Sequence, residues 1–404
     1  MKSSVIIIII LSSFYLRAES LLQPSPFARA VFANGLLRSL LQPELPQPVV
    51  LFSPASLQKL LVAFYNFTYP DHMRLLAQDL CLVEGHHFVA TKVAEVLTGP
   101  LPVRLRQVTA DLITGYIAPD IAQEYFAQDF AELGADILLR NYFIYDGQHE
   151  IASSFHRSVW EYFNVEVLSK RQRGVAALLQ QLGIASPELQ LYSGLQFHAH
   201  LDEQFRSVGK YSYARGQYRH ADRLLLGGKL VPCMCLELPL QTETSPSLLT
   251  LLLLMPAPKM SLEQLEAALL SAEQRSYQQL SKQLIPTSVA VRLPNLQFYS
   301  KVTLQRFTKE MTWLFDAQLP YHGNPRRTRL KRLVQTIRLR IHAPGGASTL
   351  AETAVNLLHF FYTNNTFDCA TRPFLFVVRS KDVIYFMGRH RRTSARAGAH
   401  FGRI

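Results

Sequence analysis

Two apolar runs near the C-terminus decide the fold: Arg372-Pro373-Phe374-Leu375-Phe376 and Phe386-Met387-Gly388-Arg389. The stretches Phe374 to Val378 and Val383 to Met387 have strand length and flank Lys381-Asp382, so they predict a hairpin that closes the chain. Upstream, Val231 to Leu238 and Leu248 to Met255 predict a second strand pair around the polar turn Gln241–Ser247. We therefore expect the later part of the chain to consist mainly of buried strands.

Helical apolar spacing dominates the first half of the chain instead. It covers residues 26–41, 54–65, 71–80, 86–98, 105–116, 119–130 and 153–162, and it returns at 262–280 and 304–314. The segment Leu333 to Ile341 alternates strictly and predicts a half-buried strand. Helices that come early and strands that come late favour an α+β fold with large antiparallel sheets over repeated βαβ units. We find no repeat or linker, so residues 19–390 are expected to form one domain.

The N-terminus has the pattern of a secretory signal peptide. Lys2 precedes the apolar run Val5 to Leu11, and Ala18 offers a small residue for cleavage. The apolar run is too short to span a bilayer, although an uncleaved anchor remains the alternative. We therefore expect a signal peptide at residues 1–18 and a secreted, extracellular protein without a membrane span.

Basic residues exceed acidic ones, which gives the 404-residue chain a formal net charge of +12. Such an excess favours polyanion partners. A cluster formed by Arg326, Arg327, Arg329, Lys331 and Arg332 precedes the Leu333–Ile341 strand, and residues 391–404 make a basic tail. A sulfated glycan is the expected polyanion, not a nucleic acid; the alternative is a solvated basic face.

The sequence shows no catalytic or metal-binding constellation. It has no Gly-x-Ser-x-Gly or His-Glu-x-x-His motif, and the cysteines lack the spacing of a zinc or redox site. We therefore expect neither a cofactor nor enzyme activity. The thiols are either buried and free or include a Cys81–Cys369 disulfide. Asn66 and Asn364 begin glycosylation sequons, whose use the sequence leaves open.

An ordered set of segments resembles the serpin (serine protease inhibitor) family. The segments are Leu51–Leu57, Asn141–Ile144, Phe163–Val167, Val231–Pro239, Leu249–Pro256, Val289–Phe298, Arg372–Phe376 and Phe386–Arg389. They cover nearly the whole chain from about Pro26 to Arg389, in the family's order. The resemblance implies a single domain with three mainly antiparallel β-sheets, about eight or nine helices and an exposed reactive loop near the C-terminus.

The resemblance also implies a mechanism. A serine protease attacks the reactive loop as bait, and the cleaved loop then inserts into the central sheet as a new strand that distorts the acylated enzyme. The inhibitor is thus a suicide substrate, acts as a monomer and has no catalytic residues of its own. Aligned on the Leu333–Ile341 strand, the loop covers about residues 343–371.

The hinge of the loop falls on small residues, as insertion between two strands requires. These are Gly345, Gly346, Ala347, Ser348 and Thr349. In the family register Gly346, Ser348, Leu350 and Glu352 turn inward on insertion. Glu352 would bury a carboxylate, which costs several kcal/mol unless the charge is paired.

The bond that a protease would cut is expected in an aromatic stretch of the loop. Its residues are Leu358, His359, Phe360, Phe361 and Tyr362. The stretch has no Lys or Arg, so a trypsin-like target is disfavoured and a chymotrypsin-like one is favoured. The alternative is an apolar loop that packs against the body of the protein.

Two further departures from the family lie where the sheet must open. Leu201 stands where the family has a tryptophan, and the helix that covers the central sheet is expected to be shortened to about Val175–Leu182. Together with the atypical hinge, they keep a rival hypothesis open. In that reading the chain is a serpin-fold binding or carrier protein that does not inhibit proteases.

Overall fold

The computed structural model describes most of the later part of the chain and less of the first part. The described residues are 26–40, 49–65, 130, 133–147, 151, 153–182, 189–242, 249–271, 277–304, 318–321, 324–347, 355, 358, 360, 365–381 and 383–391. Six α-helices lie in these ranges: α2 (Pro26–Leu40), α3 (Pro54–Tyr65), α8 (Ser153–Phe163), α9 (Val175–Gln181), α10 (Leu262–Ser271) and α11 (Tyr277–Lys282). The helices predicted at 71–80, 86–98, 105–116 and 119–129 lie outside the described residues.

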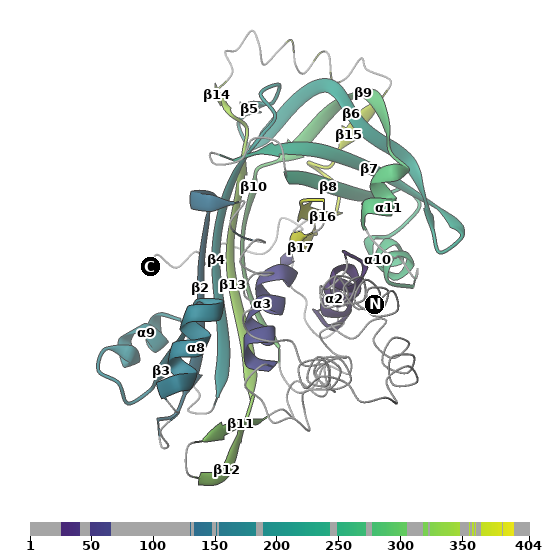
Figure 1. Cartoon of the computed structure of the whole chain (residues 1–404). Coiled ribbons are helices and arrows are strands. Elements are labelled where there is room, and N and C mark those ends of the chain that lie inside the picture. The colour runs from purple at the N-terminus through teal and green to yellow at the C-terminus, as the bar shows by residue number, and fades with distance from the viewer. Residues whose placement is uncertain are drawn as a thin grey trace, which may run out of the picture.

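A tall sheet of five strands forms the centre of the molecule (Figure 1). Its order is β3-β2-β4-β13-β10, from β3 (Val165–Ser169), β2 (Ile137–Tyr145), β4 (Gln190–Leu201), β13 (Arg332–His342) and β10 (Leu296–Leu304). Helix α3 lies on one side of this sheet and the short helix α9 on the other (Figure 1). We call these sides the inner and outer faces.

The other strands form two further layers at one end of the central sheet. The first runs β7 (Lys229–Gln241), β8 (Leu249–Pro256), β16 (Phe374–Arg379), β17 (Ile384–His390) and β1 (Val49–Phe52). The second joins β5 (Arg206–Val208), β6 (Tyr211–Leu226), β9 (Ile285–Pro294) and β15 (Thr366–Asp368). Strand β6 also pairs with β7, and β4 pairs with β7, so the three predicted sheets connect into one 15-stranded network.

Alternation along the central strands separates the core from the outer face. Odd-numbered residues of β13, from Leu333 to Ile341, are buried, whereas Arg338 and Arg340 are exposed. The predicted half-buried strand is thus confirmed. The inner side chains pack with α2 and α3, while a smaller apolar cluster that includes Tyr142, Tyr192 and Val175 lies between the outer face and α9.

Within the described ranges, most predicted elements lie where the sequence placed them. The closing hairpin is confirmed by the antiparallel pairing of β16 with β17, and the shortened helix by the bounds of α9. Within the range of the single helix predicted at 262–280, the structure describes helix α10 and the first residues of helix α11. Leu304, expected to begin a helix, ends strand β10, because its alternating neighbours continue the pairing with β13 as far as Leu333. Among the described helices, none is long and apolar enough to cross a membrane.

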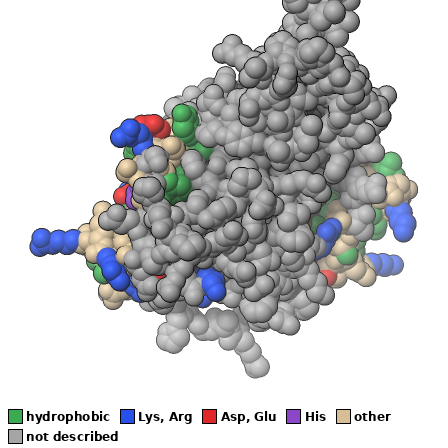
Figure 2. Space-filling view, turned by 60° about the horizontal axis from the view of Figure 1, so that its bottom comes forward, with side chains coloured by type: hydrophobic (Ala, Val, Ile, Leu, Met, Phe, Trp, Pro, Cys, Tyr) green, Lys and Arg blue, Asp and Glu red, His purple; other side chains and the backbone are tan. Residues whose placement is uncertain are grey.

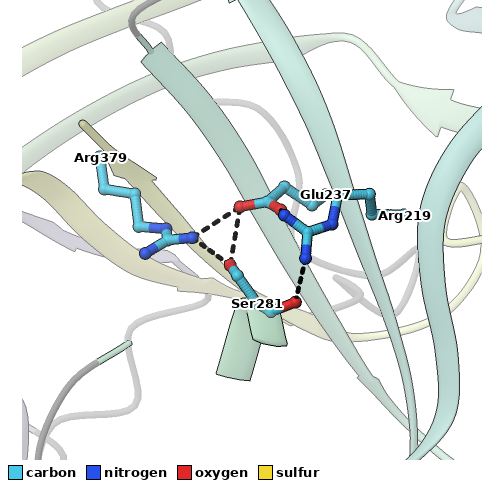
Figure 3. A network of polar contacts seen from close by, with 4 residues as sticks. All are labelled: Arg219, Glu237, Ser281 and Arg379. Atoms are coloured by element: carbon cyan, nitrogen blue, oxygen red, sulfur yellow. Dashed lines mark hydrogen bonds and ion pairs between the residues drawn. The ribbon is translucent and has the colours of Figure 1, made fainter. Parts of the chain in front are cut away.

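A buried ionic network anchors α11 to the strands (Figure 3). The Glu237 carboxylate accepts hydrogen bonds from the Arg379 guanidinium at 2.6 Å and from the Ser281 hydroxyl at 2.8 Å. Arg219 lies 3.5 Å from the same carboxylate and donates to the backbone oxygen of Ser281 at 2.5 Å. Because Glu237 and Arg379 are both buried and paired, this cluster holds three strands and a helix together and is not an acid–base site.

Candidate functional site

The contact line between β4 and β13, which we call the seam, is where the predicted loop would have to insert. The two strands are parallel neighbours whose pairing runs without a break from Arg332 and Gln190 to His342 and His200. A new strand can enter only if this ladder of backbone hydrogen bonds opens. The structure therefore shows the sheet before any insertion.

A polar brace crosses under the seam on the inner face, in otherwise apolar surroundings. The Ser53 backbone N–H donates to the Gln335 side-chain oxygen at 2.8 Å, and the Gln335 amide donates to the Ser53 carbonyl at 3.2 Å. Three residues further along the chain, the Ser56 hydroxyl lies 2.6 Å from the Ser193 hydroxyl. All four residues are buried. The first turn of α3 thereby holds β13 through Gln335 and β4 through Ser193.

This geometry makes the brace a lock on the seam. Ser53 and Ser56 belong to one helical turn, in which the Ser53 hydroxyl also accepts from the Ser56 backbone N–H at 3.3 Å. Room for another strand requires β4 and β13 to separate by about 4.8 Å. A rigid turn cannot follow both strands, so opening the seam breaks at least one of the two contacts.

A second contact crosses the seam on the outer face. The Tyr192 hydroxyl of β4 forms a hydrogen bond with the Thr336 hydroxyl of β13. The Tyr192 ring lies over Gly194, where an added Cβ would come within 3.1 Å of a ring carbon. Burial is the main cause that raises the pKa of Tyr192, so the hydroxyl keeps its proton for this contact. Both faces of the seam are thus tied by side chains.

The hinge residues leave the sheet at the end of the seam. Gly345, Gly346 and Ala347 form strand β14 (Gly345–Ala347), which pairs in parallel with β5 at Arg206 and Ser207. Leu201, the residue that replaces the family's tryptophan, is buried nearby, where β4 pairs with Leu240 of β7. The described part of the hinge therefore continues beyond the central sheet and does not turn back into it.

Histidines gather on the outer face at the same end. His342 lies opposite His200, with ring centroids 6.3 Å apart, and Arg340 lies opposite His198. Burial lowers the pKa of His342 first, and the nearby His200, His198 and Arg340 lower it further. A proton on His342 would thus lie near Arg340 of the same strand and near two histidines across the seam.

Acidification is expected to destabilise the closed sheet through His342. Because its folded-state pKa lies below the unfolded value of about 6.5, the unfolded chain binds more protons as pH falls through that value. The contribution of His342 to stability is therefore fully present above pH 6.5 and is lost progressively as the pH falls below that value. Melting temperatures measured between pH 7.5 and pH 5 should fall less steeply for His342→Gln than for the unchanged chain; equal slopes would exclude this contribution.

The far end of the loop region is held by an ion pair. Arg292 of β9 donates twice to Asp368 of β15, at 2.9 and 2.6 Å. The same guanidinium lies over the ring of Phe360, which is buried and also contacts Tyr213 edge to face. Leu358, by contrast, is 54% exposed. Within the expected scissile stretch, Leu358 is accessible while Phe360 packs against the body.

Several predicted site residues lie outside the described residues. They are Ser348, Thr349, Leu350, Glu352, His359, Phe361 and Tyr362, together with the sequon residues Asn66 and Asn364 and with Cys81. Cys233, Cys235 and Cys369 are buried free thiols, and burial raises the pKa of Cys233 to about 12. Such thiols are poor nucleophiles at neutral pH.

The sequence interpretation missed the residues of the brace. Gln335 was visible as the one polar side chain at an inward position of an alternating strand, which is the available signal, because a buried amide needs partners. Its partner Ser53 lies 282 residues earlier in the chain, where the sequence indicated only the start of a helix. The Ser53 hydroxyl caps that helix by accepting from the Ser56 backbone N–H.

Comparison with known proteins identifies the fold. Residues 215–392 match the family model described as Serpin (serine protease inhibitor). No curated protein matches the chain by sequence. Similar solved structures include mouse protein-Z dependent protease inhibitor, with a TM-score of 0.65 and 15% identity over 93% of this chain and 99% of that one.

Two further structures show the same fold. Native protease nexin-1, solved with heparin, has a TM-score of 0.61 and 14% identity over 93% of this chain and 100% of that one. SRPN18 from Anopheles gambiae has a TM-score of 0.62 and 14% identity over 93% of this chain and 99% of that one. The match over residues 215–392 and the likeness of these structures over 93% of the chain show that the chain has the serpin fold.

Proposed function

We propose that this chain is a secreted serpin that inhibits a serine endopeptidase as a suicide substrate, through a reactive loop at about residues 343–371. The observation that carries the proposal is the seam: β4 and β13 pair directly, and the small hinge residues of β14 leave from its end. A loop cut beyond this hinge would therefore lie next to the two strands between which it has to insert. Catalysis by the chain itself is not part of the proposal.

The loop sequence supports a particular class of target protease. Two of the similar structures are named as a protease inhibitor and a protease nexin. The stretch 357–362 contains no Lys or Arg, and its exposed Leu358 and neighbouring aromatic residues suit a chymotrypsin-like specificity pocket. We therefore propose a chymotrypsin-like target.

Incubation with chymotrypsin, elastase and trypsin followed by denaturing gels tests the function. We expect an SDS-stable complex with chymotrypsin and none with trypsin, because the acyl bond survives only if insertion distorts the protease. Clean cleavage of the loop by all three enzymes, with full protease activity remaining, would contradict inhibition.

Replacing Glu352 is expected to improve inhibition. In the inserted register this carboxylate turns inward, where an unpaired charge costs several kcal/mol, so insertion is slowed relative to deacylation. Glu352→Ala should raise the ratio of complex to cleaved inhibitor on the gel severalfold. Thr353→Ala is the matched control, because Thr353 is the next residue and faces outward in the same register. An equal effect of both variants would contradict the proposed register of the inserted loop.

We propose that the mature protein begins near Glu19 after removal of a signal peptide at residues 1–18 and acts outside the cell as a monomer. Residues 19–390 form the single domain, and 391–404 form a basic tail. Asn66 and Asn364 are the proposed glycosylation sites. Edman sequencing of the exported protein reports the cleavage point directly.

A sulfated polyanion is the second proposed partner. Arg326, Arg327 and Arg329 lie on β12 (Asn324–Arg329), which pairs with β11 (Gln318–Tyr321) below the central sheet (Figure 1). Among the described residues at the rim of the face that Figure 2 shows, Lys and Arg side chains stand out. One similar structure was solved with heparin. Elution from heparin below physiological salt would contradict this partner.

A binding or carrier role without inhibition is the second candidate function. Leu201 is buried at the junction of β4 and β7, where the family has a tryptophan, and the covering helix α9 is short. The first feature alters the hinge end of the seam, and the second lies near the opposite end, where α9 packs with Tyr192 and Val334. This reading predicts cleavage without a stable complex in the gel assay above.

A further inference from the structure

A hollow of ≈ 380 Å³ lies on the outer face of the central sheet, beside the end of α9. Its floor is formed by four neighbouring strands, β2, β4, β13 and β10. Pockets that hold small organic ligands have volumes of about 300–1,000 Å³. The hollow is large enough for one such molecule, and no part of the predicted inhibitory mechanism uses it.

Strand register explains why the hollow exists. Arg140, Gly194, Thr336 and Lys301 are direct partners in one row across the four strands. Gly194, in the middle, has no side chain, while long side chains rise at both ends of the row. The short α9 ends beside it, since Lys301 donates to the backbone oxygen of Leu182 at 3.1 Å. The result is a trough with cationic ends.

The next row adds an aromatic wall. Leu138, Gln196, Arg338 and Tyr299 are again direct partners, and the Arg338 guanidinium lies 5.9 Å from the centroid of the Tyr299 ring. The rings of Tyr142 and Tyr192 are stacked with centroids 5.9 Å apart on the α9 side. Tyr142 and Tyr192 are buried, so the exposed Tyr299 ring and the Arg338 guanidinium plane are the surfaces available to flat molecules.

The charge of the lining is one-sided. Arg140, Lys301 and Arg338 line the hollow, and no acidic residue is among the described residues that do. Thr336, Gln196 and Gln181 add neutral hydrogen-bonding groups. Cations at several sides of an aromatic-walled hollow select for a carboxylate or sulfonate on an aromatic body, because guanidinium groups both pair with such anions and stack on rings.

We propose that this hollow is a binding site for an aromatic organic anion. The acidic group lies among Arg140, Lys301 and Arg338, and the ring packs against Tyr299 and the floor at Gly194. Since Gly194 and Gln196 belong to β4 while Thr336 and Arg338 belong to β13, the ligand spans the seam.

The site has a consequence for loop insertion, which rests on the proposed function. A strand inserted between β4 and β13 would separate the two halves of the floor by about 4.8 Å. The site therefore exists only in the closed sheet, and by linkage its ligand must oppose insertion.

Fluorescence titration with 8-anilinonaphthalene-1-sulfonate tests the site on the folded, full-length secreted chain. We expect saturable binding at one site and a Kd about tenfold weaker in Arg338→Gln, the loss expected for one charge-assisted hydrogen bond. Arg340→Gln is the matched control, because Arg340 is exposed on the same face of β13 but does not line the hollow. Equal affinities of the two variants would overturn the proposal.

Two further measurements sharpen the result. Gln196→Trp, which fills the hollow from β4, should abolish binding even if Arg338→Gln folds poorly; retained binding would refute the site. The uncharged analogue N-phenyl-1-naphthylamine should bind weakly and be indifferent to Arg338→Gln. Equally tight binding of this analogue would refute the selectivity for anions.

Cleaving the loop separates this proposal from the proposed function. If both hold, the dye affinity is lost once the loop is cut and inserted. If the dye still binds the cleaved protein and the Arg338 and Arg340 variants still differ, the site stands and insertion fails. If those variants do not differ before cleavage, the site fails whatever the loop does.

Discussion

Gln335→Leu is expected to lower the free energy of unfolding by about 1–3 kcal/mol, the penalty of leaving a buried donor unsatisfied. The leucine fills similar space but accepts no hydrogen bond, so the Ser53 backbone N–H loses its 2.8 Å partner. The Ser53 carbonyl keeps one hydrogen bond, because it also accepts from the Leu57 backbone N–H at 3.2 Å. Urea denaturation measures the loss.

The same variant should loosen the seam. Because opening must break a contact at Ser53 or Ser56, removing Gln335 in advance lowers the barrier, and the cut loop should insert faster. Gln297→Leu is the matched control, since Gln297 is exposed on the neighbouring strand β10. If both variants have the same urea midpoint and insertion rate, the inner-face brace is not a lock.

Glu237→Ala should have the largest effect on stability, a loss of about 3–5 kcal/mol. The substitution leaves the Arg379 guanidinium buried without its carboxylate and removes the acceptor of the Ser281 hydroxyl (Figure 3). Arg219 is 47% exposed and can turn to solvent, so Arg379 carries most of the penalty. Urea unfolding followed by circular dichroism reports the change.

Two companion variants isolate the cause of that loss. Glu203→Ala removes an exposed carboxylate and should change stability by less than about 0.5 kcal/mol. Glu237→Leu combined with Arg379→Met removes both charges and should recover much of the stability, because an apolar pair avoids the buried ion. A double variant as unstable as Glu237→Ala would show that packing, not the unpaired charge, causes the loss.

Local patterns were enough to predict much of the fold. The strands β7, β8, β16 and β17 follow from continuous apolar runs, and β13 from strict alternation. The shortened α9 followed from a length comparison with the family. These features depend on neighbours within one element, which a single sequence displays.

Features that depend on pairing between distant segments were not predictable. The joining of three sheets arises because β6 is long enough to pair with both β7 and β9 and because the end of β4 pairs with β7. Strand β14 pairs with β5 over only a few residues of low bulk, which carry no periodic signal. The outer hollow depends on which residues share a row across four strands, and register of that kind is fixed only in the folded sheet.

For the candidate site, the sequence proposed hinge residues but not the contacts that hold the sheet closed. The sequence placed the hinge at Gly345 to Ala347 and pointed to the seam, yet it gave no sign of Tyr192 and Thr336 as a contact across it. Each of these residues is unremarkable in its own strand. Only the parallel register of β4 and β13 brings them together.

The most direct test of the account is a thermal melt of the intact chain and of the chain cut once between residues 355 and 362. Insertion of a new strand between β4 and β13 adds about ten backbone hydrogen bonds at about 1 kcal/mol each, which should raise Tm by about 10 °C or more. Such a rise would show that the seam opens and accepts the loop. An unchanged or lower Tm after cleavage would contradict the central claim that this sheet is built to take up its own loop.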